Sequence, residues 1–522
     1  MPRSWLKYRK YTHFSPKLTY KNRGFIIGYV RDPESVKTHK FFPFIHYTIV
    51  ESKKKWVKNK KGKPILTDRR PEEIKKREIF YANHLDSQIF SYYAHLLNKR
   101  LEAIYEAGPV LSSAVIGYRS IRISKRNNRC KSNIHFTKEV IDFIKNYEGS
   151  TLNIVSVDIK DFFNSLDHKI LKRKWASLFG NHSLSPDHYA VYKAITKFNY
   201  VEISDILKEF SELKIKRLSH LREKEILSFC KNGHEFKKRV VGNGLIKKDP
   251  FDEKSDKRSK GIPQGSPISS VLSNLYLLEF DRIFSNLLTE LGGIYRRYSD
   301  DIVFICPPEN TEEIEGLMKA LLGHKNYQLP IKEEKVQQLD LQKKGANSAG
   351  AIWEIRDQNN KIAAFKYLGF QFDGNKVLLR NKSISKYYRK TKSLIRRSAY
   401  YAKAAKKYNK KNPEKKPKDP WIYRSNIYRK KTHFGSRTFR TNGKIKRGNY
   451  IGYAYKASKI MGGSHIKHQV SRHWKTVEDY IKHHEDKNKL ERQPSHRKVR
   501  AMMNRNKKDT SQSSNDTDPN SE

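Results

Sequence analysis

Three aspartates lie beside short apolar runs, in positions suited to holding a cation. Asp300 and Asp301 are adjacent in GGIYRRYSDDIVFIC (residues 292–306), between two runs that read as the strands of a hairpin. Asp158 ends a third apolar run, TLNIVSVD. Side chains alternate between the two faces of a strand. If these strands are neighbours, we therefore expect Asp158 and Asp300 to converge, with Asp301 close by at the turn. Adjacent carboxylates repel unless a cation lies between them.

A hard divalent metal ion is the cation that such carboxylates select. Proteins hold Mg²⁺ with one or two carboxylates together with substrate phosphates. Two such ions stabilise both the attacking and the leaving oxygen of a phosphoryl displacement. A pair of aspartates in a turn is often only a polar hairpin, but here the pair follows Asp158 and the tight loop GIPQGSP. This order predicts a site for two Mg²⁺ ions, with Mn²⁺ as a substitute, that performs a phosphoryl displacement on a bound nucleotide.

Periodicity predicts the elements that position these residues. Residues 151–158 read as a strand that runs into a helix, and a second helix is expected after GIPQGSP, over SSVLSNLYLLEFDRIFSNLL. Another helix is expected from Pro71, because Pro71 and the two acids after it suit a first helical turn. The segment AAFKYLGFQFDGNKVLLR predicts a further hairpin with its turn at Asp373-Gly374.

The charge of the chain indicates a polyanionic partner. Lys and Arg number 108 against 54 Asp and Glu, which gives a net charge of +54 over 522 residues. An excess of this size needs an anionic partner to offset self-repulsion, and nucleic acid is the leading candidate. No run approaches the roughly 20 apolar residues of a membrane-spanning helix. The first residues lack an apolar signal core, so we expect a cytoplasmic protein without a membrane partner.

The three cysteines do not suggest a metal site or disulfides. Cys130, Cys230 and Cys306 are widely spaced, which argues against a zinc knuckle or a disulfide framework.

Residues 386–411 contain no acid and read as a basic helix. Its aromatic and aliphatic stripe recurs every seven residues, at Tyr387, Leu394, Tyr401 and Tyr408. We expect this stripe to face inward and the cations to face a nucleic-acid duplex.

Five segments, in this order, resemble the palm motifs of reverse transcriptases. They are NIVSVDIKDFFNSL, GIPQGSPISSVLSNLYL, YRRYSDDIVF, LPIKEEKVQ and FKYLGFQF. The resemblance covers roughly residues 75–380 and is closest to bacterial enzymes of the retron, group II intron and defence-associated groups. The stand-alone antiphage enzymes fit best, because no retron-type NAxxH signature and no endonuclease pattern is found. Ser299 stands where alanine is commoner in the family.

The resemblance implies an α+β right-hand polymerase fold with fingers, palm and thumb. The expected domains are a basic N-terminal extension (1–74), fingers (75–150) and a palm (151–376) with a helical insertion at about 195–258. A basic helical thumb and RNA-binding region (377–485) and a disordered tail (486–522) follow.

The family's roles carry over to the matching positions. Asp158, Asp300, Asp301 and the backbone carbonyl of Ile159 would bind the metal ions. Phe163 matches the aromatic gate that favours deoxynucleotides by excluding a 2′-hydroxyl. The remaining nucleotide contacts would be Gln264, Gly265, Lys335, Arg119 and Arg122, with Lys125 and Arg126 as further fingers candidates. The primer and template contacts would be Tyr298, Tyr367, Leu368, Gly369, Arg77, Lys390 and Arg396.

The function expected from these features is RNA-directed DNA polymerase activity in bacterial antiviral defence. The partners would be deoxynucleotides, the complementary DNA product and an RNA template, in particular a structured non-coding RNA. Whether the chain forms a homo-oligomer stays open. The alternative is an RNA-binding maturase or chaperone with an incidental palm, against which the intact aspartates count. An RNA-synthesising polymerase is a third reading, and Phe163 argues against it.

Overall fold

The computed structural model divides into two compact units that are interleaved in sequence. Unit 1 comprises Met1–Ile121 and Thr151–Asp340, and unit 2 comprises Arg122–Ser150 and Leu341–Glu522. The structure describes residues 5–493 except 55–56, 59–63, 66–71, 125–126, 216–219, 222–224, 249–258, 334–335, 349, 436–438, 442–443 and 447. No helix among these residues is long and apolar enough to cross a membrane.

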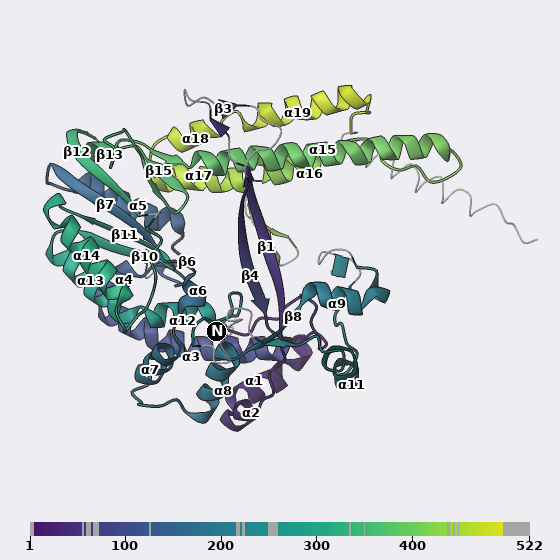
Figure 1. Ribbon diagram of the computed structural model, residues 1–522. Helices are drawn as coiled ribbons and strands as arrows, with labels where there is room; N and C mark the ends of the chain where they lie inside the picture. The colour runs from purple at the N-terminus through teal and green to yellow at the C-terminus, as the bar shows by residue number, and fades with distance from the viewer. Residues whose placement is uncertain are drawn as a thin grey trace, which may run out of the picture. The chain divides into compact units, whose positions relative to one another are not determined.

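Three antiparallel strands form the centre of unit 1. They are β7 (Thr151–Asp158), β10 (Ile294–Tyr298) and β11 (Asp301–Cys306), in the order β10-β11-β7. Consecutive residues of β7 and β11 are buried, as expected for strands covered on both faces. Helices α13 (Leu278–Glu290) and α14 (Thr311–Gly323) pack against these strands (Figure 1). The predicted strand and hairpin are confirmed.

The other helices of this core surround the strands or follow them. They are α3 (His84–Ala107), α4 (Pro109–Ala114), α6 (Phe162–Ser165), α7 (His168–Leu178) and α12 (Ser269–Tyr276), with the 3-10 turn η4 (Pro308–Asn310). The predicted helix after GIPQGSP is therefore present as two consecutive helices, α12 and α13. Phe280, Phe284 and Tyr295 pack together in the core between α13 and β10.

A second sheet in unit 1 is built on a long hairpin. β1 (Phe44–Lys54) and β4 (Glu72–Tyr81) pair from Ile45 with Tyr81 to Lys54 with Glu72. Two short strands extend the sheet in the order β4-β1-β8-β9, namely β8 (Asn199–Glu202) and β9 (Lys247–Lys248). The helix predicted from Pro71 is wrong in its first part. Pairing with β1 overrides the local helical signal, and the helix α3 begins only at His84.

The N-terminal segment and the predicted insertion complete unit 1. Their helical elements are η1 (Tyr20–Asn22), α1 (Arg23–Arg31), α2 (Pro33–Lys37), α9 (Ile203–Glu209), η2 (Ser211–Leu213), α11 (Gly233–Phe236) and the π-helix η3 (Lys237–Val241). The helix α8 (Pro186–Thr196) leads into the insertion. A two-stranded sheet joins β2 (Val57–Lys58) and β3 (Pro64–Ile65). The insertion thus contributes the strands β8 and β9 as well as helices.

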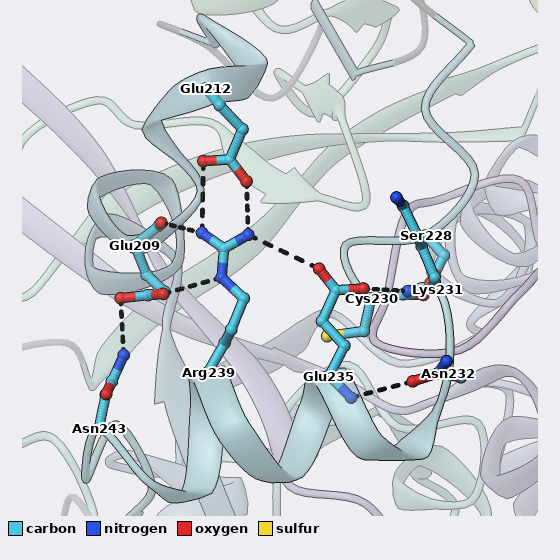
Figure 2. Close-up of polar contacts among 9 residues, drawn as sticks. All are labelled: Glu209, Glu212, Ser228, Cys230, Lys231, Asn232, Glu235, Arg239 and Asn243. Atoms are coloured by element: carbon cyan, nitrogen blue, oxygen red, sulfur yellow. Dashed lines mark hydrogen bonds and ion pairs between the residues drawn. The ribbon is translucent and has the colours of Figure 1, made fainter.

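One arginine ties the helices of the insertion together (Figure 2). Arg239 on η3 binds Glu209 with Nε at 2.8 Å, contacts Glu235 at 3.6 Å and donates to Glu212. Its guanidinium also lies 3.9 Å from the centre of the Phe210 ring, a cation–π contact. These contacts fix α11 and η3 to the end of α9, over a small apolar core separate from that of the central strands.

Unit 2 contains short sheets and a set of basic helices. Its strands are β5 (Arg122–Ser124), β6 (Asn127–Cys130), β12 (Gln337–Asn347, mostly in this unit), β13 (Gly350–Asp357), β14 (Phe365–Tyr367), β15 (Phe370–Phe372), β16 (Val377–Leu379), β17 (Phe439–Thr441) and β18 (Lys444–Lys446). The predicted hairpin is confirmed as β15 and β16, with Asp373 accepting from the Lys376 amide at the turn.

The helices of unit 2 are mainly C-terminal. They are α5 (Asn133–Asn146), α15 (Asn381–Lys411), α16 (Arg424–Lys431), η6 (His433–Gly435), α17 (Tyr450–Met461), α18 (His465–Gln469) and α19 (His473–Asn488). Arg424 joins two of them, α16 and α19, because its buried side chain binds Glu478 at 2.7 Å and Glu485 at 2.6 Å on α19. α19 reaches past residue 486, where the predicted tail was set to begin, and residues 494–522 lie outside the described part.

The basic helix predicted at 386–411 is present as α15, but its inward stripe differs from the prediction. The buried residues are Tyr387, Thr391, Ile395, Ala399, Ala402 and Ala405. Tyr401, predicted to face inward, is 64% exposed. A straight helix of 3.6 residues per turn drifts away from a seven-residue repeat, so the buried line shifts by one residue along the helix. The α+β fold class is confirmed.

Candidate active site

The register of β7 and β11 brings two of the three aspartates together. Asp158 is directly opposite Asp301 in the antiparallel pair, so their side chains leave the same face of the sheet. Directly opposed residues have Cβ atoms about 4.5–5.5 Å apart. The expected partner of Asp158 was Asp300. Instead Asp300 lies in the turn, where its carbonyl accepts from the Ile159 amide at 3.2 Å. The strands end here, so all three aspartates share one edge of the sheet.

A strained two-residue turn presents Asp300. Tyr298 pairs with Asp301, which leaves Ser299 and Asp300 as the loop. Ser299 has φ +64°, a conformation that favours glycine at the first position of a type II′ turn. Gly117 packs against this turn so closely that a Cβ on it would lie 2.6 Å from the Ser299 nitrogen. Strain of this kind persists only where the surroundings fix it, and such positions cluster at functional sites.

Arg297 and Asp281 supply that support from within the core. Both side chains are 0% exposed, and Arg297 Nε donates to Asp281 Oδ1 at 2.7 Å. Arg297 Nη1 donates to the Ser299 carbonyl at 3.1 Å, and Nη2 donates to Asn274 Oδ1 at 3.3 Å. Burial opposes the charge of Arg297, but the Asp281 carboxylate outweighs it and raises the pKa of the guanidinium. A buried ion pair therefore supports the strained turn.

Two tyrosines complete the support. The Tyr295 hydroxyl donates to Asp281 Oδ1 at 2.7 Å, and burial raises its pKa well above the ordinary value, so that it stays a donor. Ser299 Oγ donates to the Tyr118 hydroxyl at 3.2 Å. Burial also raises the pKa of Tyr118, and the nearby charge of Asp300 adds to the increase. The turn is thus held by hydrogen bonds from both sides.

Lys332 places a cation on the first aspartate. Its Nζ donates to Asp158 Oδ1 at 3.1 Å and to the Ile159 carbonyl at 3.3 Å. The two backbones are also joined, because the Lys332 amide donates to the Asp158 carbonyl at 3.0 Å. The ammonium therefore joins a carboxylate and a carbonyl that the sequence assigns to a metal ion.

The donor set fits a divalent metal that is completed by substrate. In the part of the chain that the structure describes, no three His, Cys, Asp or Glu side chains are grouped so that they could hold a metal ion. Mg²⁺ needs only one or two carboxylates when substrate phosphates fill the remaining positions. Lys332 shows that a cation is accommodated between Asp158 and the Ile159 carbonyl. Asp301 and Asp300 lie on the neighbouring strand and turn, where they can complete such a site.

The loop GIPQGSP is fixed against two neighbouring elements. The Ile262 amide donates to the Phe163 carbonyl at 2.8 Å, and the Gln264 carbonyl accepts from the Phe80 amide at 2.9 Å. Gly265 has φ +117°, and a Cβ there would lie 2.5 Å from the Phe80 carbonyl oxygen. Glycine is therefore required at this position. Phe163 is half-buried against the core, beside Phe162.

Arg119 does not have the environment expected of a nucleotide contact. Its side chain is only 3% exposed and binds Glu102 at 2.8 Å. It also donates to the carbonyls of Ser112 and Val115, and its guanidinium lies 3.9 Å from the Tyr105 ring centre. With its donors occupied, Arg119 is better explained as a support for the segment that carries Gly117 and Tyr118.

The other predicted site residues lie at several places in the two units. In unit 1, Tyr298 is half-buried near Tyr118, and Arg77 is exposed on β4, 3.7 Å from Glu51. Lys335, Lys125 and Arg126 lie outside the described residues. In unit 2, Tyr367, Leu368 and Gly369 form the turn between β14 and β15, and both Leu368 and Gly369 have positive φ. Arg122, Lys390 and Arg396 are exposed on β5 and α15.

The structure adds functional residues that sequence reasoning missed. Lys332 lies in the same motif as Lys335 but was passed over, because lysine is abundant and no contact with Asp158 could be read from spacing. Arg297 lies in the run YRRY, and Asp281 lies among the buried apolar residues of α13. An ion pair between distant segments leaves no local pattern. Only the motif context of Lys332 could have drawn attention to it.

Comparisons with solved structures find distant likenesses. An apo telomerase from Candida tropicalis, truncated from its C-terminal domain, is 14% identical over 59% of this chain and 53% of that chain, with a TM-score of 0.35. Telomerase from Candida albicans in complex with a TWJ fragment of telomeric RNA is 11% identical over 89% of this chain and 65% of that chain, also with a TM-score of 0.35. The chain thus spans about half to two thirds of the length of these telomerases.

Comparison with protein families gives a clearer result. The sequence profile described as reverse transcriptase (RNA-dependent DNA polymerase) matches residues 85–372. The match includes Asp158, the loop GIPQGSP, Asp300 and Asp301. Among curated proteins, no sequence matches. Because the profile covers more than half of the 522 residues, the chain belongs to the reverse transcriptase family, a family of RNA-dependent DNA polymerases.

Proposed function

We propose that this chain makes complementary DNA from an associated RNA template by metal-dependent nucleotidyl transfer. The register of β7 and β11 carries the proposal, because it sets Asp158 opposite Asp301 beside the turn with Asp300. The buried pair Arg297–Asp281 supports it, since it stabilises the strained turn that presents Asp300. Nucleotidyl transfer is the reaction that such a carboxylate group, in this family, performs.

Asp158, Asp300, Asp301 and the Ile159 carbonyl would hold two Mg²⁺ ions. When bound, the ions neutralise charge on the triphosphate and favour attack by a terminal hydroxyl. The chain's own residues orient the reactants. The turn fixes Asp300, and the Lys332 ammonium, 3.1 Å from Asp158 Oδ1, would contact a phosphate oxygen of the nucleotide. The loop GIPQGSP would position the nucleotide base through a backbone fixed to Phe80.

Phe163 would choose the sugar of the incoming nucleotide. Its carbonyl accepts from the Ile262 amide at 2.8 Å, so its backbone is fixed to the GIPQGSP loop. A bulky ring at this position leaves no room for a 2′-hydroxyl. We expect Phe163→Ala to incorporate ribonucleotides at least tenfold more readily relative to deoxynucleotides, measured as a ratio of kcat/KM in primer extension. An unchanged ratio contradicts the gate.

RNA is the partner that the charge and the family favour. The net charge of +54 suits a lasting complex with a structured non-coding RNA. The exposed cations of α15, Lys390 and Arg396 among them, are suited to contact phosphates of a duplex. The resemblance to stand-alone bacterial enzymes supports a cytoplasmic role in antiviral defence. Bacterial challenge with phage, with and without the catalytic aspartates, tests that role.

The decisive experiment is sequencing of the nucleic acid that copurifies with the protein. Wild type is compared with Asp300→Ala/Asp301→Ala and with a matched control, Glu312→Ala/Glu313→Ala. The control removes two adjacent acids that are exposed in the first turn of α14. We expect RNA in all three preparations, and complementary DNA only in wild type and control.

Primer extension with supplied deoxynucleotides and Mg²⁺ accompanies this experiment. We expect the aspartate variant to lose at least a thousandfold in rate, because both acids would act in the chemical step. RNA in every preparation without DNA in any, and no extension by wild type, overturns the proposal. The maturase or chaperone alternative then becomes the better explanation.

A further inference from the structure

A cavity in unit 1 lies among segments that the proposed chemistry does not use. It has a volume of about 900 Å³. Three parts of the chain line it: residues 37–43 before β1, residues 190–199 at the end of α8, and residues 233–246 around α11 and η3. None of the residues assigned to metal, nucleotide or primer belongs to this lining. The cavity is therefore separate from the candidate active site.

Aromatic rings form the walls of this cavity. Phe41, Phe42, Phe198 and Phe236 contribute to the lining. Phe42 and Phe236 pack with ring centres 5.0 Å apart, and Phe41 stacks on Phe90 at 5.3 Å. The Phe42 amide donates to buried Asp86 at 2.9 Å, which fixes the backbone between these rings. The aromatic lining is thus apolar and fixed by ring packing and by the hydrogen bond to Asp86.

Five lysines surround the aromatic walls, and the lining contains no carboxylate. They are Lys37, Lys40, Lys193, Lys197 and Lys237, and all five are exposed. Lys37 pairs with Glu34 at 3.0 Å. Within the described ranges, no ion pair is found for the other four. We call this feature the lysine cavity. Its charge is complementary to the phosphate groups of a ligand that also has an apolar part.

The wall formed by α11 and η3 is held by the Arg239 cluster (Figure 2). Gly233, Phe236, Lys237 and Val241 line the cavity from these two helices. Arg239, on the same η3, is bound to Glu209 and Glu212 and lies near Glu235. Val241 is 48% exposed although it is aliphatic. The cluster keeps an apolar, partly exposed surface in place beside the lysines.

We infer that the lysine cavity binds single-stranded RNA, with one unstacked base against the phenylalanine rings and the flanking phosphates on the lysines. Aromatic walls combined with a cationic rim are how proteins hold single strands, because every base has a stacking face and every linkage a charge. The inference rests on the proposed function for the choice of RNA. In the proposed synthesis the DNA product is paired with its RNA template, so the single-stranded segments belong to the RNA.

The test measures binding of a defined oligonucleotide to the full-length protein. The probe is a twelve-nucleotide oligouridylate with a single 2-aminopurine, whose fluorescence falls when it stacks on a ring. The test variant is Lys193→Glu/Lys197→Glu. The matched control is Lys208→Glu/Lys325→Glu, which changes the same charge at two exposed lysines of unit 1 outside the cavity. Neither variant alters a buried residue, so both are expected to fold.

We expect the test variant to raise the Kd at least tenfold and the control to raise it less than threefold. The slope of log Kd against log salt concentration should fall by about 1.4 in the test variant, because each lost phosphate contact of a single strand contributes roughly 0.7. Phe236→Ala should abolish most of the fluorescence change while leaving the salt slope unaltered. Equal Kd values for test and control, or unchanged fluorescence of the bound probe in wild type, overturn the inference.

A DNA version of the same probe tests whether the cavity prefers RNA to DNA. Binding to DNA as tight as to RNA, with the same response to the variants, overturns the assignment to RNA. The measurement contains no deoxynucleotide triphosphate and requires no synthesis. A wild type that binds the probe as expected but fails in primer extension therefore refutes the proposed function and leaves the cavity as an RNA site. Extension without the binding difference refutes the cavity alone.

Discussion

Two groups of carboxylates in unit 1 each have a cation from the same chain, and the cations differ. In the insertion, Glu209, Glu212 and Glu235 surround the guanidinium of Arg239. At the end of β7, the ammonium of Lys332 reaches Asp158 and the Ile159 carbonyl. The first cation sits in the middle of its acids with contacts to all three. The second approaches from the adjoining segment with one flexible amine.

The nature of the cation shows which group is structural. A guanidinium is planar, always charged and holds several oxygens in a fixed geometry, whereas an ammonium is a point charge on a flexible stem. Arg239 cannot be replaced without loss of the cluster. Lys332 can leave Asp158 when a stronger cation arrives. The insertion cluster therefore stabilises helices, and the cluster on β7 and β11 is suited to exchange one cation for another.

The largest effect is expected from removing the support behind the aspartate turn. Arg297→Met leaves the Asp281 charge buried without its partner, which costs about 3–5 kcal/mol of folding free energy. The turn also loses the donor to the Ser299 carbonyl, so kcat in primer extension should fall more than KM changes. Urea unfolding and steady-state kinetics measure both.

Arg282→Met is the control for that variant. Arg282 pairs with Glu279 at 3.1 Å, but the side chains are 47% and 53% exposed. Exposed pairs contribute roughly 0–1 kcal/mol, so stability and kcat should stay close to those of wild type. Equal effects of the two substitutions contradict the role given to Arg297.

A smaller loss of stability is expected in the insertion. The side chain of Arg239 is 23% exposed, so water screens part of the repulsion that Arg239→Met would leave among the three glutamates. We expect a cost of about 1–2 kcal/mol, measured by urea unfolding with hydrogen exchange to locate it. Loss of protection should be confined to α9, α11 and η3. Loss that spreads to β7 and β11 shows that the two clusters are not independent.

If a metal ion replaces Lys332 at Asp158, substitution of Lys332 should change the affinity of the protein for the metal. Lys332→Ala removes a competitor for the carboxylate, so the protein without nucleotide should bind Mn²⁺ about threefold more tightly, as measured by electron paramagnetic resonance. Lys332→Arg, which keeps a cation there, should bind no more tightly than wild type. Weaker binding in the alanine variant means that Lys332 assists the metal and does not compete with it.

The smallest effect concerns pH. The hydrogen bond from Arg239 lowers the pKa of Glu212 below its ordinary value of 4.5. A carboxyl with a lower pKa in the folded state adds stability above the unfolded value, and this stability is lost as the pH falls through the folded pKa. The difference in urea midpoint between wild type and Glu212→Gln should therefore be full at pH 7 and shrink below about pH 4.5. A difference that does not depend on pH contradicts this account.

The sequence predicted the strands and the aspartates of the candidate site, because these leave a local pattern. The alternation of apolar residues predicted β7, β10 and β11, and the strand ends located Asp158, Asp300 and Asp301. The register of β7 with β11 could not be predicted, because the same alternation of apolar residues allows either Asp300 or Asp301 to lie opposite Asp158. The sequence favours helix for β4, whose extended form depends on β1 residues 18 to 36 positions earlier in the chain.

Residues that act through long-range pairs were also missed. Asp281 and Arg297 belong to different elements and meet only in the folded core. Arg119 shows the converse, because a basic residue that looks available in sequence is occupied by Glu102 and two carbonyls. Sequence records the type of a charge but not the neighbour that neutralises it.

The interleaving of the two units has a consequence for synthesis on the ribosome. α5 presents an apolar face that includes Ile134, Phe136 and Val140, and its partners in unit 2 are β13 and α17. The chain must grow by roughly 200 residues beyond α5 before β13 emerges, which takes about 10–40 s at ordinary rates of elongation. For that time α5 lacks both β13 and α17. A nascent chain of this length would need a chaperone, or an early RNA ligand, to shield that face from aggregation.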